Sequence, residues 1–189
     1  LVGLFLAKRV DFHLPILKSI FTQPLSKKVI KEITVKSIIL GIVVAIAIYF
    51  ADFIFTSYGA TISTSQNLAP IWQKLLAAFY GGITEEILMR LFLMTLLVWI
   101  GKKIFRQNQP NKFTIIISIF IAAVIFGLGH LPITASLTQI TPIIVLRAIV
   151  LNGIGGLVFG WLYWKKGLES AIIAHFTADI FLLTILPLL

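Results

Sequence analysis

The sequence contains no cysteine. Disulfide bonds, thiol nucleophiles and thiolate metal sites are therefore all excluded. Charged residues are also scarce, at 12% of the 189 residues, whereas 59% of the residues are hydrophobic. A composition this apolar excludes a soluble globular domain. It predicts an all-α fold in which a bundle of transmembrane helices lies in the lipid bilayer.

Acidic residues are the scarcer charge type, with seven against sixteen lysines and arginines and a net charge of +9. This excess does not indicate a nucleic-acid-binding protein, because the basic residues do not share one polar surface. They gather in the connections between apolar runs, at 27–36, 101–112 and 165–166, whereas 52–69 and 131–142 contain no lysine or arginine. The positive-inside rule predicts that the three basic connections are cytosolic and that the two uncharged connections are outer loops.

The apolar runs predict five to six spans, of which five are visible at 37–55, 69–100, 113–131, 143–164 and 168–188. The run 69–100 would be about 48 Å long as an α-helix, which exceeds the bilayer core of about 30 Å. It must therefore tilt, kink at Gly81–Gly82, or begin as an interfacial helix. Residues 1–36 mix apolar and basic positions, which predicts an interfacial amphipathic segment or the remnant of a truncated span. Residues 37–189 then form the membrane-embedded domain.

Ionisable residues inside the run 69–100 contrast with its apolar character. "TEEILMR" places Glu86 and Arg90 four residues apart, so that they share a helix face and can form an ion pair. Glu85 lies five residues from Arg90 and is rotated away from that pair. Because each ionisable group at bilayer depth costs about 2.5–3.5 kcal/mol, a purely structural pair would account for only one of the two acids. The spacing predicts that Glu86 is held by Arg90 and that Glu85 is presented to another partner.

Two histidines lie on other spans. "FGLGH" places Phe126 and His130 on one face, and "AHFTAD" does the same for His175 and Asp179. Together with Glu85 these residues admit three chemistries: a carboxylate–histidine pair that activates water, a zinc site with Glu85, His130 and His175 as ligands, or a proton relay. The sequence contains neither a helical HExxH nor a GxSxG motif, so a zinc site would need ligands from separate spans and serine nucleophile chemistry is not indicated.

Several weaker features predict structure rather than chemistry. Gly156 and Gly160, with Gly153 on the same flank, predict close helix packing. Asn152 is expected to hydrogen-bond across helices. Lys74 and Arg147 are expected to extend to the lipid headgroups, and Asp52 to cap the outer end of the first span.

The ordered set "EEILMR", "FGLGH" and "GLESAIIAHFTAD" resembles the CPBP or Abi family of intramembrane proteases, which includes the type II CAAX prenyl endopeptidases. The resemblance covers roughly residues 70–185. It implies a glutamate-type site in which Glu85 and His130 activate a water, Glu86 and Arg90 form a supporting ion pair, and His175 with the residue four positions later stabilises the oxyanion. This chain has Asp179 at that later position, where the prenyl endopeptidases carry asparagine. An ionised aspartate cannot donate a hydrogen bond, so Asp179 is either protonated or orients His175.

The resemblance also sets the expectations on function. We expect an intramembrane endopeptidase of a prokaryotic plasma membrane that acts on a peptide or protein, prenylated or bacteriocin-like, without nucleic acid. We favour chemistry without a metal cofactor, with zinc as the alternative. A non-catalytic protein of the bacteriocin-immunity type and a proton-coupled transporter are the alternatives in function.

One difficulty arises from position in the membrane. Counted from the basic connections, His130 lies near the outer end of its span and His175 nearer the inner end of another. A tilt, a kink at Gly127 or Gly129, or a broken third span is required to bring them together.

Overall fold

The computed structural model describes residues 1–62 and 69–188, so the predicted outer loop 52–69 lies partly outside the described residues. The described residues form helices and connections, without a β-strand, which confirms the all-α prediction. The helices are α1 (Val2–Val10), α2 (Pro15–Phe21), α3 (Lys27–Ser57), α4 (Ile71–Phe79), α5 (Thr95–Ile104), α6 (Lys112–Gly129), α7 (Leu131–Ala135), α8 (Pro142–Lys166) and α9 (Leu168–Ile180). Two π-helical segments, η2 (Tyr80–Glu85) and η3 (Ile87–Met94), join α4 to α5, and α9 continues into η4 (Phe181–Ile185) and the 3₁₀ turn η5 (Leu186–Leu188).

Four of the helical stretches are long and apolar enough to cross a membrane: Lys27–Ser57, Lys112–Ala135, Pro142–Lys166 and Leu168–Ile185. They correspond to four of the predicted spans. The remaining predicted span, 69–100, is helical from Ile71 onward but is divided among α4, η2, η3 and α5. Of the alternatives tilt, kink at Gly81–Gly82 and interfacial start, the structure has an irregularity at the two glycines, where the π-helical segment η2 interrupts the α-helix.

Side-chain caps fix where three of the long helices begin. The side chains of Ser26, Asn111 and Thr141 accept hydrogen bonds from backbone N–H groups three residues later, at the start of α3, α6 and α8. Such caps satisfy N–H groups that have no partner within the helix. Gly167 ends α8 with a φ of 100°, a left-handed backbone conformation that glycine adopts readily, and α9 starts at the next residue.

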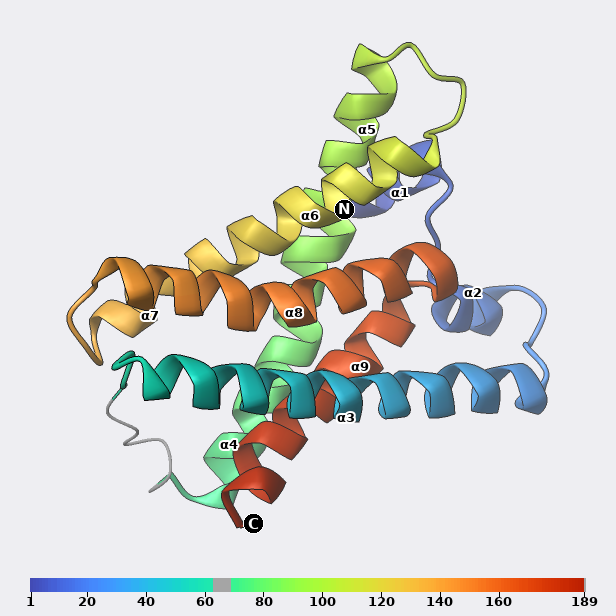
Figure 1. Cartoon of the computed structure of the whole chain (residues 1–189). Coiled ribbons are helices and arrows are strands. Elements are labelled where there is room, and N and C mark those ends of the chain that lie inside the picture. Colours follow the sequence, from blue (N-terminus) through green and yellow to red (C-terminus); the bar gives the residue numbers. More distant parts are fainter. Residues whose placement is uncertain (63–68, 189) are drawn as a thin grey trace.

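The long helices pack side by side around one core. In Figure 1, α3 and α8 lie antiparallel with nearly parallel axes, α6 lies against α8, and α9 crosses α3. The stretch from α4 to α5, drawn in green, crosses the other spans steeply. This crossing brings η2 against α9 and η3 against α6, so the helices that carry the three motifs contact one another.

Glycines permit the close approaches between these helices. A Cβ added to Gly156 would lie 2.8 Å from the Cβ of Ala123 on α6, and one added to Gly160 would lie 3.0 Å from a side-chain carbon of Ile119. The packing predicted for these two glycines is therefore confirmed. The prediction was wrong for Gly153, which has nothing within 4 Å of the added carbon.

Two charged residues have a different role from the one predicted. Arg147 on α8 does not extend to the headgroups alone, because its Nη2 lies 2.6 Å from Oδ1 of Asp52 on α3. Asp52 therefore pairs two helices and is not simply a cap for its own helix. The sequence could not show this because the two residues are 95 positions apart.

The N-terminal segment packs into the bundle. Ala7 and Val10 of α1, and Phe12 after it, are buried in the main hydrophobic core, and α1 contacts α5 and η3. The N-terminus of α2 is attached to α9, because the backbone N–H of Leu17 donates to Oε1 of Glu169 at 2.7 Å. The interfacial location predicted for residues 1–36 stays a prediction.

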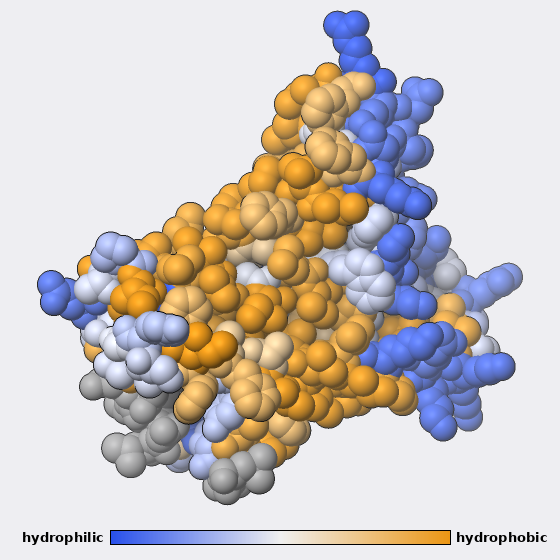
Figure 2. Space-filling model, viewed as in Figure 1, coloured by the Kyte–Doolittle hydropathy of each residue, from blue (hydrophilic) through white to orange (hydrophobic). Residues whose placement is uncertain are grey.

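The surface separates into an apolar belt and hydrophilic ends. Figure 2 shows a broad hydrophobic face, with strongly hydrophilic residues gathered along one side of the molecule. Large apolar side chains on the faces of α3 and α6 are exposed, among them Val43, Phe53, Phe113 and Phe120. Exposed apolar surface of this extent is characteristic of helices in contact with lipid.

Candidate active site

A buried ion pair supports the site. The side chain of Glu86 is fully buried and that of Arg90 is 2% exposed, and Arg90 Nη1 lies 3.2 Å from Glu86 Oε1. The pairing predicted from the four-residue spacing is thus present. The guanidinium also lies over the rings of Phe126 and Phe159, at 4.8 Å and 5.6 Å from their centroids. Within the described residues the terminal nitrogens of Arg90 have no hydrogen-bond partner, so charge attraction and the two ring faces stabilise it.

Glu86 also fixes His175. The Nδ1 atom of His175 lies 2.8 Å from Glu86 Oε1, and its ring stacks on Phe159 at 4.7 Å with an interplanar angle of 20°. A carboxylate accepts hydrogen bonds, so Nδ1 carries the proton of this bond. The other nitrogen, Nε2, then faces the remaining acids, with Asp179 Oδ2 at 3.6 Å and Glu85 Oε2 at 4.0 Å.

His130 is held by its own helix end. It is the C-cap residue that follows Gly129, the last residue of α6, and its Nδ1–H donates to the carbonyl oxygen of Phe126 at 2.8 Å. The ring of Phe126 meets the imidazole edge-on at a centroid distance of 4.8 Å. This arrangement leaves Nε2 of His130 unprotonated and available as an acceptor when the imidazole is neutral.

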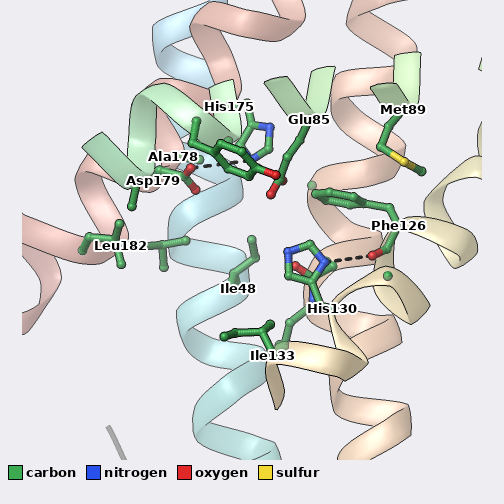
Figure 3. Close-up of a pocket in the computed structure, with 18 of the residues that line it drawn as sticks. Ile48, Glu85, Met89, Phe126, His130, Ile133, His175, Ala178, Asp179 and Leu182 are labelled. Atoms are coloured by element: carbon green, nitrogen blue, oxygen red, sulfur yellow. Dashed lines mark hydrogen bonds and ion pairs between the residues drawn. The ribbon is translucent and has the colours of Figure 1, made fainter. Parts of the chain in front are cut away.

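The four side chains Glu85, His130, His175 and Asp179 line one cavity of about 940 Å³. In Figure 3, Glu85, His175 and Asp179 lie on one side of the cavity and His130 lies across from them, below Phe126. The two histidines therefore share a cavity despite their predicted positions at different depths. They do so because α6 ends at Gly129 and α9 crosses the bundle, so that its second half reaches the level of His130.

The π-helical turn and its glycines bring Glu85 to the cavity. A Cβ on Gly81 would overlap Asp179 Oδ2 and would lie 3.3 Å from His175 Nε2, and one on Gly82 would lie 2.9 Å from the Cβ of Phe176. η2 can therefore pack directly on α9. Single π-turns inside helices are frequent at functional sites because they displace side chains from the regular helical register.

Gly81→Ala tests the protease site that the resemblance implies: we expect the added methyl group to displace the side chains of His175 and Asp179 and to lower peptide cleavage at least tenfold, with little change in unfolding temperature. Cleavage of a reporter peptide and thermal unfolding in detergent measure the two effects. Gly129→Ala is the matched control, since Gly129 also lines the cavity but has nothing within 4 Å of an added Cβ. Equal activity in the two variants would contradict the prediction.

The residues proposed as alternative zinc ligands, Glu85, His130 and His175, line the same cavity. Over residues 1–62 and 69–188, no group of three histidine, aspartate or glutamate side chains is close enough to hold one metal ion.

Sequence reasoning missed three residues at the site. Phe159 stacks on His175, and Gln73 and Lys74 line the cavity, although Lys74 was predicted to extend to the headgroups. Asn152 also lines the cavity, but its Nδ2 donates to the carbonyl of Ala148 on its own helix, so the prediction of a bond across helices was wrong. An aromatic residue beside glycines, as in "GGLVFG", was the available signal for Phe159.

The fold and the cavity together define an integral membrane protein in which acids, histidines and a buried ion pair are gathered among lipid-facing helices. The chain belongs to the type II CAAX prenyl endopeptidase Rce1-like family, which it matches over residues 67–181. This is a protease family, and the match covers every acid and histidine of the cavity. No curated protein and no solved structure gives a significant match to the chain.

Proposed function

We propose that the chain is an intramembrane endopeptidase that hydrolyses a peptide bond with a water activated by Glu85 and His130. The observation that carries the proposal is the division between two adjacent acids. Glu86 is fully buried and bound to Arg90 and His175, whereas the side chain of Glu85 is 22% exposed and lines the cavity. Of these two acids, Glu85 is the one that can reach a water and a substrate in the cavity.

The first step is addition of water. The Glu85 carboxylate takes a proton from the water while the water oxygen bonds to the substrate's carbonyl carbon. His130 accepts a hydrogen bond from the same water through Nε2, since its Nδ1–H is bonded to Phe126. The carbonyl oxygen becomes an oxyanion.

The second step is collapse of the tetrahedral intermediate. Glu85 returns the proton to the departing nitrogen, the C–N bond breaks, and a carboxylic acid and an amine are formed. His175 stabilises the oxyanion through Nε2–H in its imidazolium form, since its Nδ1–H is bonded to Glu86. Asp179, 3.6 Å from Nε2, orients the imidazolium rather than donating to the oxyanion.

The proposed substrate is a peptide or protein that is lipid-anchored or membrane-inserted, with prenylated and bacteriocin-like peptides as the two classes to compare. We further propose a prokaryotic plasma membrane in which the connections 27–36, 101–112 and 165–166 are cytosolic, as the positive-inside rule predicts.

We expect purified protein in detergent to cleave members of a peptide panel, prenylated and unmodified, at unchanged rates in the presence of a chelator. Mass spectrometry identifies the products and the bond that is cleaved. Loss of cleavage with chelator, restored by zinc, would replace the metal-free mechanism by the zinc alternative. Absence of products from every peptide, together with a cellular phenotype that survives Glu85→Gln, would favour the non-catalytic alternative.

A further inference from the structure

The cavity is lined by the middle of α8 and, on α3, α4, α6 and α9, by residues displaced toward one common end of the bundle. His175 and Asp179 are in the second half of α9, His130 follows the end of α6, and Ile48 is in the last third of α3. Gln73 and Lys74 are in the first turn of α4. The cavity thus extends toward the end of the bundle at which α3 and α6 finish and α4 starts.

Most of the basic residues lie at the opposite end of these helices, Lys74 and Arg147 excepted. Lys27 and Lys28 begin α3, Lys112 begins α6, and Lys165 and Lys166 end α8 immediately before α9 starts. Lys102 and Lys103 lie in the last turn of α5, at the far end of the stretch that begins with α4. In Figure 2 the strongly hydrophilic residues accordingly gather along one side of the molecule.

Packed side chains close the basic end. Tyr163 is 1% exposed, packs edge-on against Phe12 at 5.0 Å and is hydrogen-bonded to Thr95 at 3.0 Å. Met94 and Val98 are fully buried beside it in the same core. The connection to α2 adds a backbone bond from Leu168 N–H to the carbonyl of His13. The N-terminal segment and this core therefore separate the cavity from the basic end.

We propose that the cavity opens to the extracytoplasmic side of the membrane, so that the substrate is a peptide segment presented from that side and not a cytosolic tail. That the bound peptide is a substrate rests on the proposed function. The positive-inside rule assigns which side of the membrane is extracytoplasmic. Gln73, which is exposed, and Lys74 lie at the mouth of the cavity. Lys74 is the one lysine or arginine that lines it among the described residues, so the mouth favours an acidic group on the incoming peptide.

The absence of cysteine makes the test direct, because the unmodified protein cannot react with a maleimide. Three single substitutions at exposed, uncharged residues leave the basic clusters intact: Gln73→Cys at the mouth, Ser136→Cys after α7, and Asn108→Cys within the basic connection. Each full-length variant is treated with a membrane-impermeant maleimide in spheroplasts and, separately, in inside-out vesicles. Labelling after denaturation in detergent gives the total reactive protein.

We expect the Gln73→Cys and Ser136→Cys variants to react in spheroplasts at least tenfold faster than in inside-out vesicles, and the Asn108→Cys variant to show the reverse. Reaction of the Gln73→Cys variant only in inside-out vesicles would overturn the proposal. So would protection of this variant on both sides while Ser136→Cys reacts, since the mouth would then be closed. Labelling does not require turnover, so these outcomes are independent of whether the purified protein cleaves peptides.

Discussion

Glu85→Gln is expected to lower the rate of peptide cleavage by about 10²–10⁴-fold, because a carboxamide cannot take the proton of the attacking water. The side chain keeps its size, and Glu85 has no hydrogen bond to protein groups among the described residues, so the unfolding temperature should stay the same. Initial rates on the best peptide of the panel and thermal unfolding in the same detergent measure both effects.

Glu32→Gln is the matched control for this substitution. Glu32 lies on α3, is exposed, and pairs with Lys36 far from the cavity, so its replacement should change neither rate nor unfolding temperature. His130→Ala provides a second variant, and we expect a loss of rate with the fold retained. Turnover at the unmodified rate in Glu85→Gln would remove the general base from the mechanism and with it the proposed function.

Glu86→Ala is expected to destabilise the protein by about 3–5 kcal/mol, because it leaves the buried guanidinium of Arg90 without a counter-charge. It also removes the acceptor that holds His175 Nδ1, so activity should be lost in the fraction that remains folded. Thermal or denaturant unfolding in detergent, followed by circular dichroism, measures the loss.

The double variant Glu86→Leu with Arg90→Met separates charge from packing. Replacing a buried ion pair by apolar residues of similar volume is often neutral or stabilising, so the double variant should recover most of the lost stability. It should not recover activity, since His175 stays without its acceptor. If Glu86→Ala unfolds at the same temperature as the unmodified protein, the ion pair does not support the site.

Some side-chain contacts of the site could be predicted from the sequence, and others could not. The pairing of Glu86 with Arg90 and the separate direction of Glu85 follow from helical spacing alone, and the structure has both. These are contacts within one helical stretch, where spacing along the chain fixes distance in space. The pairing of Asp52 with Arg147 could not be found in this way, because it depends on which faces of α3 and α8 meet.

The same limit applies to Lys74, whose place beside the cavity the sequence did not indicate. Hydropathy places it near the end of a span, where lysines commonly extend to the headgroups. α4, however, contacts α9 and η4, and this packing places Lys74 beside the cavity. Phe159 was missed for a related reason. Its ring, on α8, stacks on His175 of α9, and the hydropathy of the two helices does not predict which of their faces meet.

The sequence by itself determined that this is a helical membrane protein, where its apolar helices lie, and which polar residues are too costly at bilayer depth to lack a partner or a task. Those properties depend on composition and on spacing within a helix. Only the tertiary structure decided that His130 and His175 share a cavity, that Glu86 holds His175, and that the N-terminal segment closes the basic end. Those properties depend on how helices cross, which is set by shape complementarity over many side chains and by glycines such as Gly81 that permit direct contact.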